Sequence, residues 1–186
     1  MPSLSINRLF FLLLFLCCTS CVDETIQNKQ KSTFFNLKDY FAQQVEQLDA
    51  VKQVKKSVSI NGVVEELIQD SINFSEELAV FVASDINRIA WQDKYRIDSV
   101  HSSSQQLQSV TYTALDNKLK TQFINIQYKN NRVEKITIKN NRSSMVSDSS
   151  QELEYIPSAG YTIISNQNTS LSEDRFLKVT VEFINK

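Results

Sequence analysis

Two stretches of the chain carry apolar side chains at the spacing of amphipathic helices. The first series is Phe34, Leu37, Phe41, Val45 and Leu48. The second series is Phe74, Leu78, Phe81, Val82, Ile86 and Ile89. Thr33 is suited to cap the first helix, and Asn73 with Glu76 three residues later forms a capping box for the second. We therefore expect two helices that each turn one face to a core, with Gln44 and its polar neighbours on the solvent side of the first.

A period of two replaces the helical period in the other segments. The alternating segment 54–60 and the segment 63–68 flank Asn61-Gly62, the preferred pair for a two-residue hairpin turn because both turn positions need a positive φ. Six short alternating segments follow, at 110–112, 124–128, 136–138, 153–155, 161–163 and 177–183. The pattern predicts a single α+β domain over residues 33–186, with two amphipathic helices and an N-terminal hairpin packed on a roughly six-stranded antiparallel meander.

The first twenty residues have the pattern of a secretory signal peptide. Arg8 precedes the uncharged run Leu9–Leu16, which is well short of the roughly 20 apolar residues that a membrane-spanning helix needs. We therefore expect residues 1–20 to be removed. Residues 21–32 are mostly polar and lack periodicity, so they are expected to form a flexible tether.

The segment Cys18-Thr19-Ser20-Cys21 resembles the lipobox of bacterial lipoproteins, in which small residues precede an obligatory cysteine. The resemblance implies that the chain is cut before Cys21 and that the thiol of Cys21 carries the lipid. Cys18 departs from the family, which more often has Leu there. Two or more acyl chains hold a protein firmly on a membrane, whereas one holds it only marginally. The alternative is a plain secretory signal that leaves Cys21 as a free thiol.

The acidic pair Asp23-Glu24 behind Cys21 resembles the export signal of surface lipoproteins in Bacteroidota-type bacteria. A solvated linker is the alternative interpretation of the pair. With its helix–hairpin–helix–meander pattern, the whole chain is similar to small membrane-anchored lipoproteins of that lineage. The resemblance implies a location in the cell envelope, on the outer membrane, facing either the periplasm or the medium. It also implies a membrane contact through the lipid. The sparse chemistry of the domain and the permanent anchor point to an envelope protein as a partner.

The positions of the cysteines, the net charge and the small number of glycines exclude several functional classes. Cys17, Cys18 and Cys21 all lie at or before the expected cut, so the mature domain has no disulfide, thiol nucleophile or cysteine-bound metal. Removing Arg8 leaves 19 of the 20 basic side chains against 21 acidic ones, a net charge of −2, which gives no footprint for nucleic acid. The two glycines, Gly62 and Gly160, cannot build a phosphate-binding loop. We expect no cofactor.

Candidate chemistry in the domain is sparse. His101 stands beside Ser102, Ser103 and Ser104, but neighbours on a polar loop rarely meet as base and nucleophile. A solvent-exposed loop is the simpler interpretation. The lone Trp91 is interpreted as a core side chain, with sugar stacking as the alternative. No metal-binding pattern is present, so we predict neither a catalytic nor a metal site.

Two short patterns remain as candidates. Glu152 and Glu154 share one face of a strand, as an acid/base pair would, although such pairs usually serve solvation. The triplets around Ser71 and Ser99, Asp70-Ser71-Ile72 and Asp98-Ser99-Val100, resemble acceptors for O-glycosylation in Bacteroidota-type proteins.

Three functional hypotheses follow from these observations. The first is a non-catalytic envelope lipoprotein that acts by binding, as an accessory subunit tethered to a membrane. The second is a carrier that holds an apolar ligand in a cavity between sheet and helices. The third is a hydrolase that uses Glu152 and Glu154. We rank them in that order.

Overall fold

The computed structural model describes residues 33–70, 72–170 and 172–184. The predicted signal peptide, the tether, Cys21 and Ser71 lie outside the described residues. Among the helices that are described, none has the length and apolar character needed to cross a membrane.

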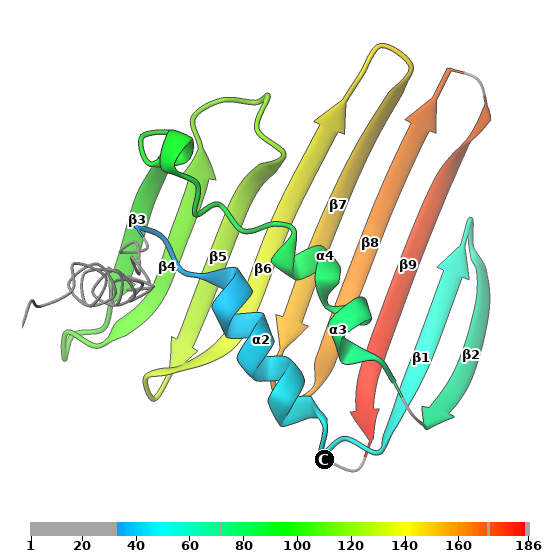
Figure 1. Ribbon diagram of the computed structural model, residues 1–186, viewed down its shortest axis with the longest axis horizontal. Helices are drawn as coiled ribbons and strands as arrows, with labels where there is room; N and C mark the ends of the chain where they lie inside the picture. The colour runs from blue at the N-terminus through cyan, green and yellow to red at the C-terminus, as the bar shows by residue number, and fades with distance from the viewer. Residues whose placement is uncertain (1–32, 71, 171, 185–186) are drawn as a thin grey trace, which may run out of the picture. The chain divides into compact units, whose positions relative to one another are not determined.

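Nine antiparallel strands form a single sheet in the order β2-β1-β9-β8-β7-β6-β5-β4-β3 (Figure 1). The strands are β1 (Gln53–Ile60), β2 (Val63–Asp70), β3 (Tyr95–His101), β4 (Leu107–Ala114), β5 (Thr121–Lys129), β6 (Arg132–Ser143), β7 (Ser147–Ile156), β8 (Gly160–Thr169) and β9 (Ser172–Ile184). From β3 to β9, each strand pairs with the next in the chain. The first hairpin joins the last strand, because β1 pairs with β9 as well as with β2.

The predicted fold class is wrong. Strands account for 56% of the described residues and short helices for 15%, so the domain is one large sheet and not a six-stranded meander under a helical layer and a separate hairpin. The six predicted strand segments lie in β4 to β9, but β3 was missed. Tyr95 and Ile97 alternate with polar residues in β3, but this segment lies before the first of the six predicted strands. The hairpin adds β1 and β2 to the same sheet because β9 offers it a free edge.

The hairpin turn itself is confirmed. Asn61 and Gly62 have φ values of 48° and 91°, and the paired register runs from Ile60↔Val63 to Gln53↔Asp70 without interruption. Asn61 also ties the turn to β9, since its Oδ1 accepts a hydrogen bond of 2.8 Å from the backbone N–H of Phe176. The turn residues therefore fix the hairpin and its place beside the last strand.

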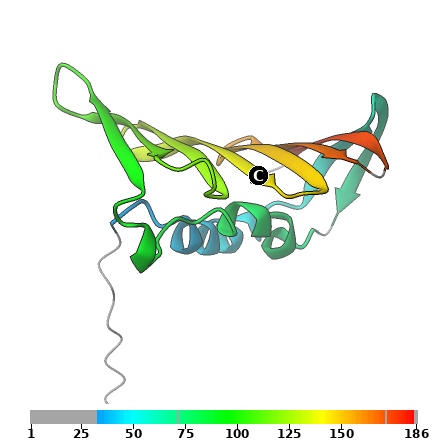
Figure 2. The ribbon, with the colours of Figure 1, turned by 90° about the horizontal axis from the view of Figure 1, so that it is seen from above.

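The helices are α2 (Leu37–Leu48), α3 (Phe74–Glu77), α4 (Ala79–Val82) and the 3-10 turn η1 (Ile89–Trp91). They lie on one face of the sheet (Figure 2). The first helix begins later than predicted, and its N-cap is Asn36, whose side chain accepts a 2.9 Å hydrogen bond from Asp39 N. Thr33 is therefore not the cap.

The second predicted helix is broken at Leu78, whose φ of −90° and ψ of 0° end α3 after one turn. Asn73 caps α3 as predicted, accepting from Glu76 N at 3.4 Å. Leu78 is fully buried at the break, as the predicted helix also required. Ile89 was expected on the buried face and is instead 72% exposed.

The core lies between this helical layer and the sheet. Phe41 of α2, Phe81 of α4 and Tyr155 of β7 are each fully buried and pack ring against ring, with centroids 5.0 to 6.0 Å apart. Trp91 is partly buried against the same core beside Tyr95, as a core side chain would be.

Candidate functional site

The residues singled out from the sequence fall into two groups, one in and after β3 and one on β7. Ser99 lies on β3 with an exposed side chain, so its hydroxyl is accessible to a modifying enzyme. His101 ends the same strand and is also exposed. The hydroxyls of Ser102 and Ser104 lie 2.8 Å apart, and Ser102 Oγ also accepts from Gln106 N at 3.2 Å. These serines thus stabilise the β3–β4 turn.

Glu152 and Glu154 lie on the face of β7 that the helices leave uncovered. Each is paired across the strands with a lysine of β6: Lys139 Nζ lies 2.8 Å from Glu152 Oε1, and Lys135 Nζ lies 3.3 Å from Glu154 Oε2. The pair therefore forms two cross-strand ion pairs on a solvated sheet face.

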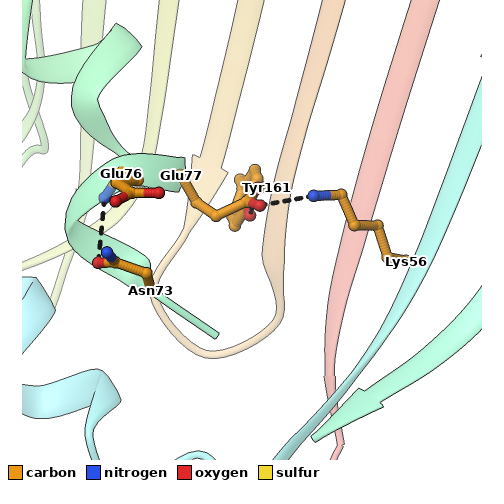
Figure 3. Close-up of polar contacts among 5 residues, drawn as sticks. All are labelled: Lys56, Asn73, Glu76, Glu77 and Tyr161. Atoms are coloured by element: carbon orange, nitrogen blue, oxygen red, sulfur yellow. Dashed lines mark hydrogen bonds and ion pairs between the residues drawn. The ribbon is translucent and has the colours of Figure 1, made fainter. Parts of the chain in front are cut away.

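A second polar cluster lies under α3, where Glu77 contacts two strands (Figure 3). Lys56 Nζ of β1 lies 2.5 Å from Glu77 Oε1, and the hydroxyl of Tyr161 on β8 donates to Glu77 Oε2 over 2.6 Å. Burial raises the pKa of Glu77, but the hydrogen bonds from Lys56 and Tyr161 and the charge of Lys56 outweigh it, so the pKa lies below its ordinary value. Burial, together with the bond to Glu77, raises the pKa of Tyr161.

This cluster positions the hairpin and performs no evident chemistry. Both carboxylate oxygens of Glu77 are engaged, and the pKa directions keep Glu77 ionised and Tyr161 protonated near neutral pH. The contacts join α3 to β1 and β8, two strands that β9 separates in the sheet. The first strand of the hairpin is thereby held against the helical layer, while β2 extends beyond it.

The two edges of the sheet differ in regularity, although both carry charged side chains. Natural sheets blunt an open edge with charged side chains, prolines or bulges, because unpaired backbone groups attract other strands. Edge strand β3 has the ion pair between Arg96 and Asp98 and a register shift at Val100/His101. Edge strand β2 pairs with β1 in unbroken register and contains neither lysine nor proline.

Apolar side chains gather around β2 and the hairpin turn. The β2 edge patch, as we name it, comprises Ile60, Val63, Val64, Leu67, Ile68 and Phe176. These six residues are half of the twelve large hydrophobic side chains that are exposed within the described part of the chain. The helical layer stops short of β2 (Figure 2), and Val63 and Leu67, on the helix side, are 70% and 48% exposed. Clustered exposure of this kind is typical of an interaction surface.

The backbone of β2 can extend the sheet. In a two-residue hairpin the residues that flank the turn form a hydrogen-bonded pair, and bonded and non-bonded pairs then alternate. With Ile60↔Val63 as the bonded pair, the N–H and C=O groups of Val64, Glu66 and Ile68 point away from β1. A further strand could bond to these groups.

The charge on the β2 edge is acidic. Glu65, Glu66 and Asp70 are all exposed on this strand. Lys55 of β1 lies 3.0 Å from Glu66 Oε2, and this contact partly offsets one of the three charges. The surface thus combines aliphatic side chains with negative charge and outward backbone groups.

Sequence reasoning predicted the hairpin but missed this surface. The available signal was the doublets Val63-Val64 and Leu67-Ile68, which place apolar side chains on both faces of one strand. That pattern is typical of a strand covered on both faces, and we had assumed that the hairpin packs on the meander. Only the position of β2 at the sheet edge leaves both faces open.

Comparison with known proteins adds no family assignment, since no protein-family model, curated protein or solved structure matches the chain. The class that the fold defines is a nine-stranded antiparallel sheet with helices on one face. Its best candidate site is the β2 edge patch with the adjoining backbone.

Proposed function

We propose that this protein is a non-catalytic envelope lipoprotein, anchored through Cys21, that acts by binding a protein partner. One observation carries the binding role: the regular edge strand β2, which exposes four aliphatic side chains and outward backbone groups. The partner contributes an extended segment that adds a tenth strand beside β2, a common mode of recognition in which backbone hydrogen bonds supply affinity and side chains supply specificity.

Charge indicates the chemistry of the partner segment. A segment that places lysine or arginine opposite Glu65, Glu66 and Asp70, and aliphatic side chains opposite Leu67 and Ile68, would match both faces of β2. A second copy of this chain is less suitable. When two β2 strands pair antiparallel about a two-fold axis near their centre, the acidic side chains of one copy face or neighbour those of the other.

The carrier hypothesis has less support. Phe41, Phe81 and Tyr155 fill the centre of the interface between sheet and helices, where an apolar ligand would have to lie. The hydrolase hypothesis is also weaker, because Glu152 and Glu154 each have a lysine partner. Binding of a partner at β2 requires neither a cavity nor an acid/base pair.

Site-specific crosslinking in the producing cells tests the binding role. Ile68, which is 65% exposed, is replaced by the photoreactive residue benzoylphenylalanine. The matched control carries the same replacement at Val100, which is 53% exposed on the opposite edge strand. We expect a discrete adduct from position 68 only, with the crosslink mapped to a basic, aliphatic segment. The double variant Val64→Lys and Ile68→Lys should abolish capture by a photoreactive group at Leu67, whereas Ile97→Lys and Val100→Lys should not.

Other adducts would contradict the proposal. Equal crosslinking from both edges would mean non-specific contact. An adduct made of two copies of this chain, together with a dimer in light scattering, would replace the partner with self-association.

The anchor is tested separately by mass spectrometry of the mature N-terminus. We expect Cys21 to be the first residue and to carry acyl chains, and Cys21→Ala to leave the chain uncut and free of lipid. A mature chain with an unmodified thiol at Cys21 would overturn the anchor without affecting the crosslinking result.

A further inference from the structure

A second surface lies where the chain that leads from Cys21 enters the domain. Phe34 is 4% exposed, and its ring lies edge-on to Tyr95 of β3 and Tyr112 of β4, with centroids 5.6 and 5.5 Å away. Asn87 clamps the backbone at this point: its Oδ1 accepts from Phe34 N, and its Nδ2 donates to the carbonyl of Phe35, each over 3.1 Å. The entry point of the chain is therefore fixed at the β3–β4 end of the sheet.

The clamp places this entry point next to the 3-10 turn η1. Asn87 is two residues before Ile89, the first residue of η1, which lies over the β3–β4 end of the sheet (Figure 1). Ile89 is 72% exposed, and Trp91 is partly buried beside Tyr95. Leu115, which is 63% exposed, donates its backbone N–H to the carbonyl of Lys94, three residues after Trp91, over 2.9 Å. One short region thus exposes two large aliphatic side chains and part of an indole.

A cation adjoins these apolar groups. Arg88 is exposed, and its Cζ lies 4.4 Å from the centroid of the Trp91 ring. Among the residues described, Arg88 forms no ion pair with a carboxylate, whereas Lys94 is paired with Asp93 at 3.3 Å. Tryptophan is enriched at the headgroup level of bilayers, where exposed aliphatic side chains are buried and arginine meets lipid phosphate. The residue types therefore match a membrane surface.

The proposed lipid would hold a membrane near this region. Cys21 precedes Phe34 by thirteen residues, a length of chain that spans at most about 45 Å. A tether of this length raises the effective concentration of a nearby bilayer, so a surface too small to bind alone becomes occupied. The edge strand β2 lies at the opposite end of the sheet, with seven strands between β2 and β3, or about 38 Å at the usual strand spacing.

We propose that the η1 region, which we define as Arg88, Ile89, Trp91 and Leu115, is a second contact of this protein with the membrane surface. The inference rests on the proposed lipid anchor, which supplies the proximity. Ile89 and Leu115 enter the headgroup region, the exposed part of Trp91 lies at the interface, and Arg88 binds lipid phosphate. The contact turns the β3 end of the sheet toward the bilayer and leaves β2 accessible to a partner strand.

Trp91 is the single tryptophan of the chain, so its fluorescence reports on this region alone. Residues 21–186 contain Cys21 as their one cysteine, and its thiol can be coupled to a maleimide phospholipid in vesicles of phosphatidylethanolamine and phosphatidylglycerol. We expect brominated phospholipid in these vesicles to quench the emission of Trp91 at least about twofold, because an interfacial tryptophan lies close to the acyl chains. The coupling reproduces the tether whether or not cells acylate Cys21, so failure of the anchor and failure of this contact are separate results.

Variants then locate the contact. Ile89→Glu with Leu115→Glu should reduce the quenching of Trp91 at least about twofold, because charged side chains resist entry into the interface. The matched control is Ile60→Glu with Ile68→Glu, which makes the same change in charge at the opposite end of the sheet and should leave the quenching unchanged.

The orientation is tested by moving the reporter with Trp91→Phe and Val64→Trp, and we expect bromine not to quench the relocated tryptophan on β2. The proposal is overturned if bromine leaves the emission of Trp91 unchanged, or if the Ile89/Leu115 variant is quenched as strongly as the parent chain. Equal quenching of the relocated tryptophan and of Trp91 would also overturn it, since the domain would then have no preferred orientation.

Discussion

The hydroxyl of Tyr155, at the centre of the sheet, donates a 2.8 Å hydrogen bond to Oε1 of Gln44 in α2. Tyr155 is fully buried and Gln44 is 7% exposed, although the residues are 111 positions apart. Burial raises the pKa of Tyr155, so the hydroxyl stays protonated and remains a donor. This bond fixes α2 on the sheet at a single polar point within an apolar interface.

Removing the hydroxyl with Tyr155→Phe should lower the free energy of unfolding by about 1–3 kcal/mol, because the buried acceptor on Gln44 loses its donor. Urea denaturation measures the change. The double variant Tyr155→Phe with Gln44→Leu should cost less than the sum of the single changes, since both polar groups are then gone. Additive single costs would show that the bond contributes nothing to stability.

The two glycines should respond very differently to alanine. A Cβ on Gly160, where φ is +144°, would lie 1.9 Å from the carbonyl oxygen of Val181, whereas a Cβ on Gly62 would meet nothing within 4 Å. We expect Gly160→Ala to cost about 3 kcal/mol or more, and Gly62→Ala about 1–2 kcal/mol from its positive φ alone. Thermal unfolding of both variants compares them, and similar losses would contradict the contact between β8 and β9.

The stability contributed by Glu77 should depend on pH. Its pKa is lowered in the folded state, so the contribution is fully present above the unfolded value of about 4.3 and is lost as the pH falls through the folded value. At pH 7, Glu77→Gln should cost about 1–2 kcal/mol. Urea titrations between pH 7 and pH 3 should show the difference between the parent chain and Glu77→Gln shrinking toward acid.

The variants Tyr161→Phe and Lys56→Met test the cause of this pH dependence. Each removes one group that lowers the pKa of Glu77, so each should move the loss of stability to higher pH. A difference between the parent chain and Glu77→Gln that stays constant from pH 7 to pH 3 would exclude the ionised cluster.

Changing both Glu152 and Glu154 to Gln should have little effect. Exposed ion pairs contribute about 0–1 kcal/mol each, and these two lie on an open sheet face. We expect a loss of at most about 1–2 kcal/mol in urea denaturation and unchanged crosslinking at the β2 edge patch. Loss of the cellular role with the fold intact would instead favour the hydrolase hypothesis.

Much of the local structure could be predicted from the sequence because it depends on neighbouring residues. Asn61-Gly62 specified a hairpin turn, Asn73 specified a helix start, and period-two alternation located six strands. The lipid on Cys21 stays a prediction, as does O-glycosylation at Ser71 and Ser99. These rest on short motifs that are read without reference to the fold.

Contacts between distant segments were beyond such reasoning. Gln44 was assigned to solvent because its neighbours are polar, yet Tyr155 brings it into the core. Asn140 was not singled out either, since its hydrogen bond to Ser84 joins β6 to a residue 56 positions away in the chain.

The sequence by itself determined the turns, most of the strands and the absence of cysteine from the domain, because each of these follows from local residue types. The tertiary structure alone decided that β1 pairs with β9 and that β2 becomes an open edge. It also decided that the second helix breaks at Leu78. The physical reason is that strand pairing and burial bring together residues far apart in the chain, and their combined free energy outweighs the local preference of any one segment.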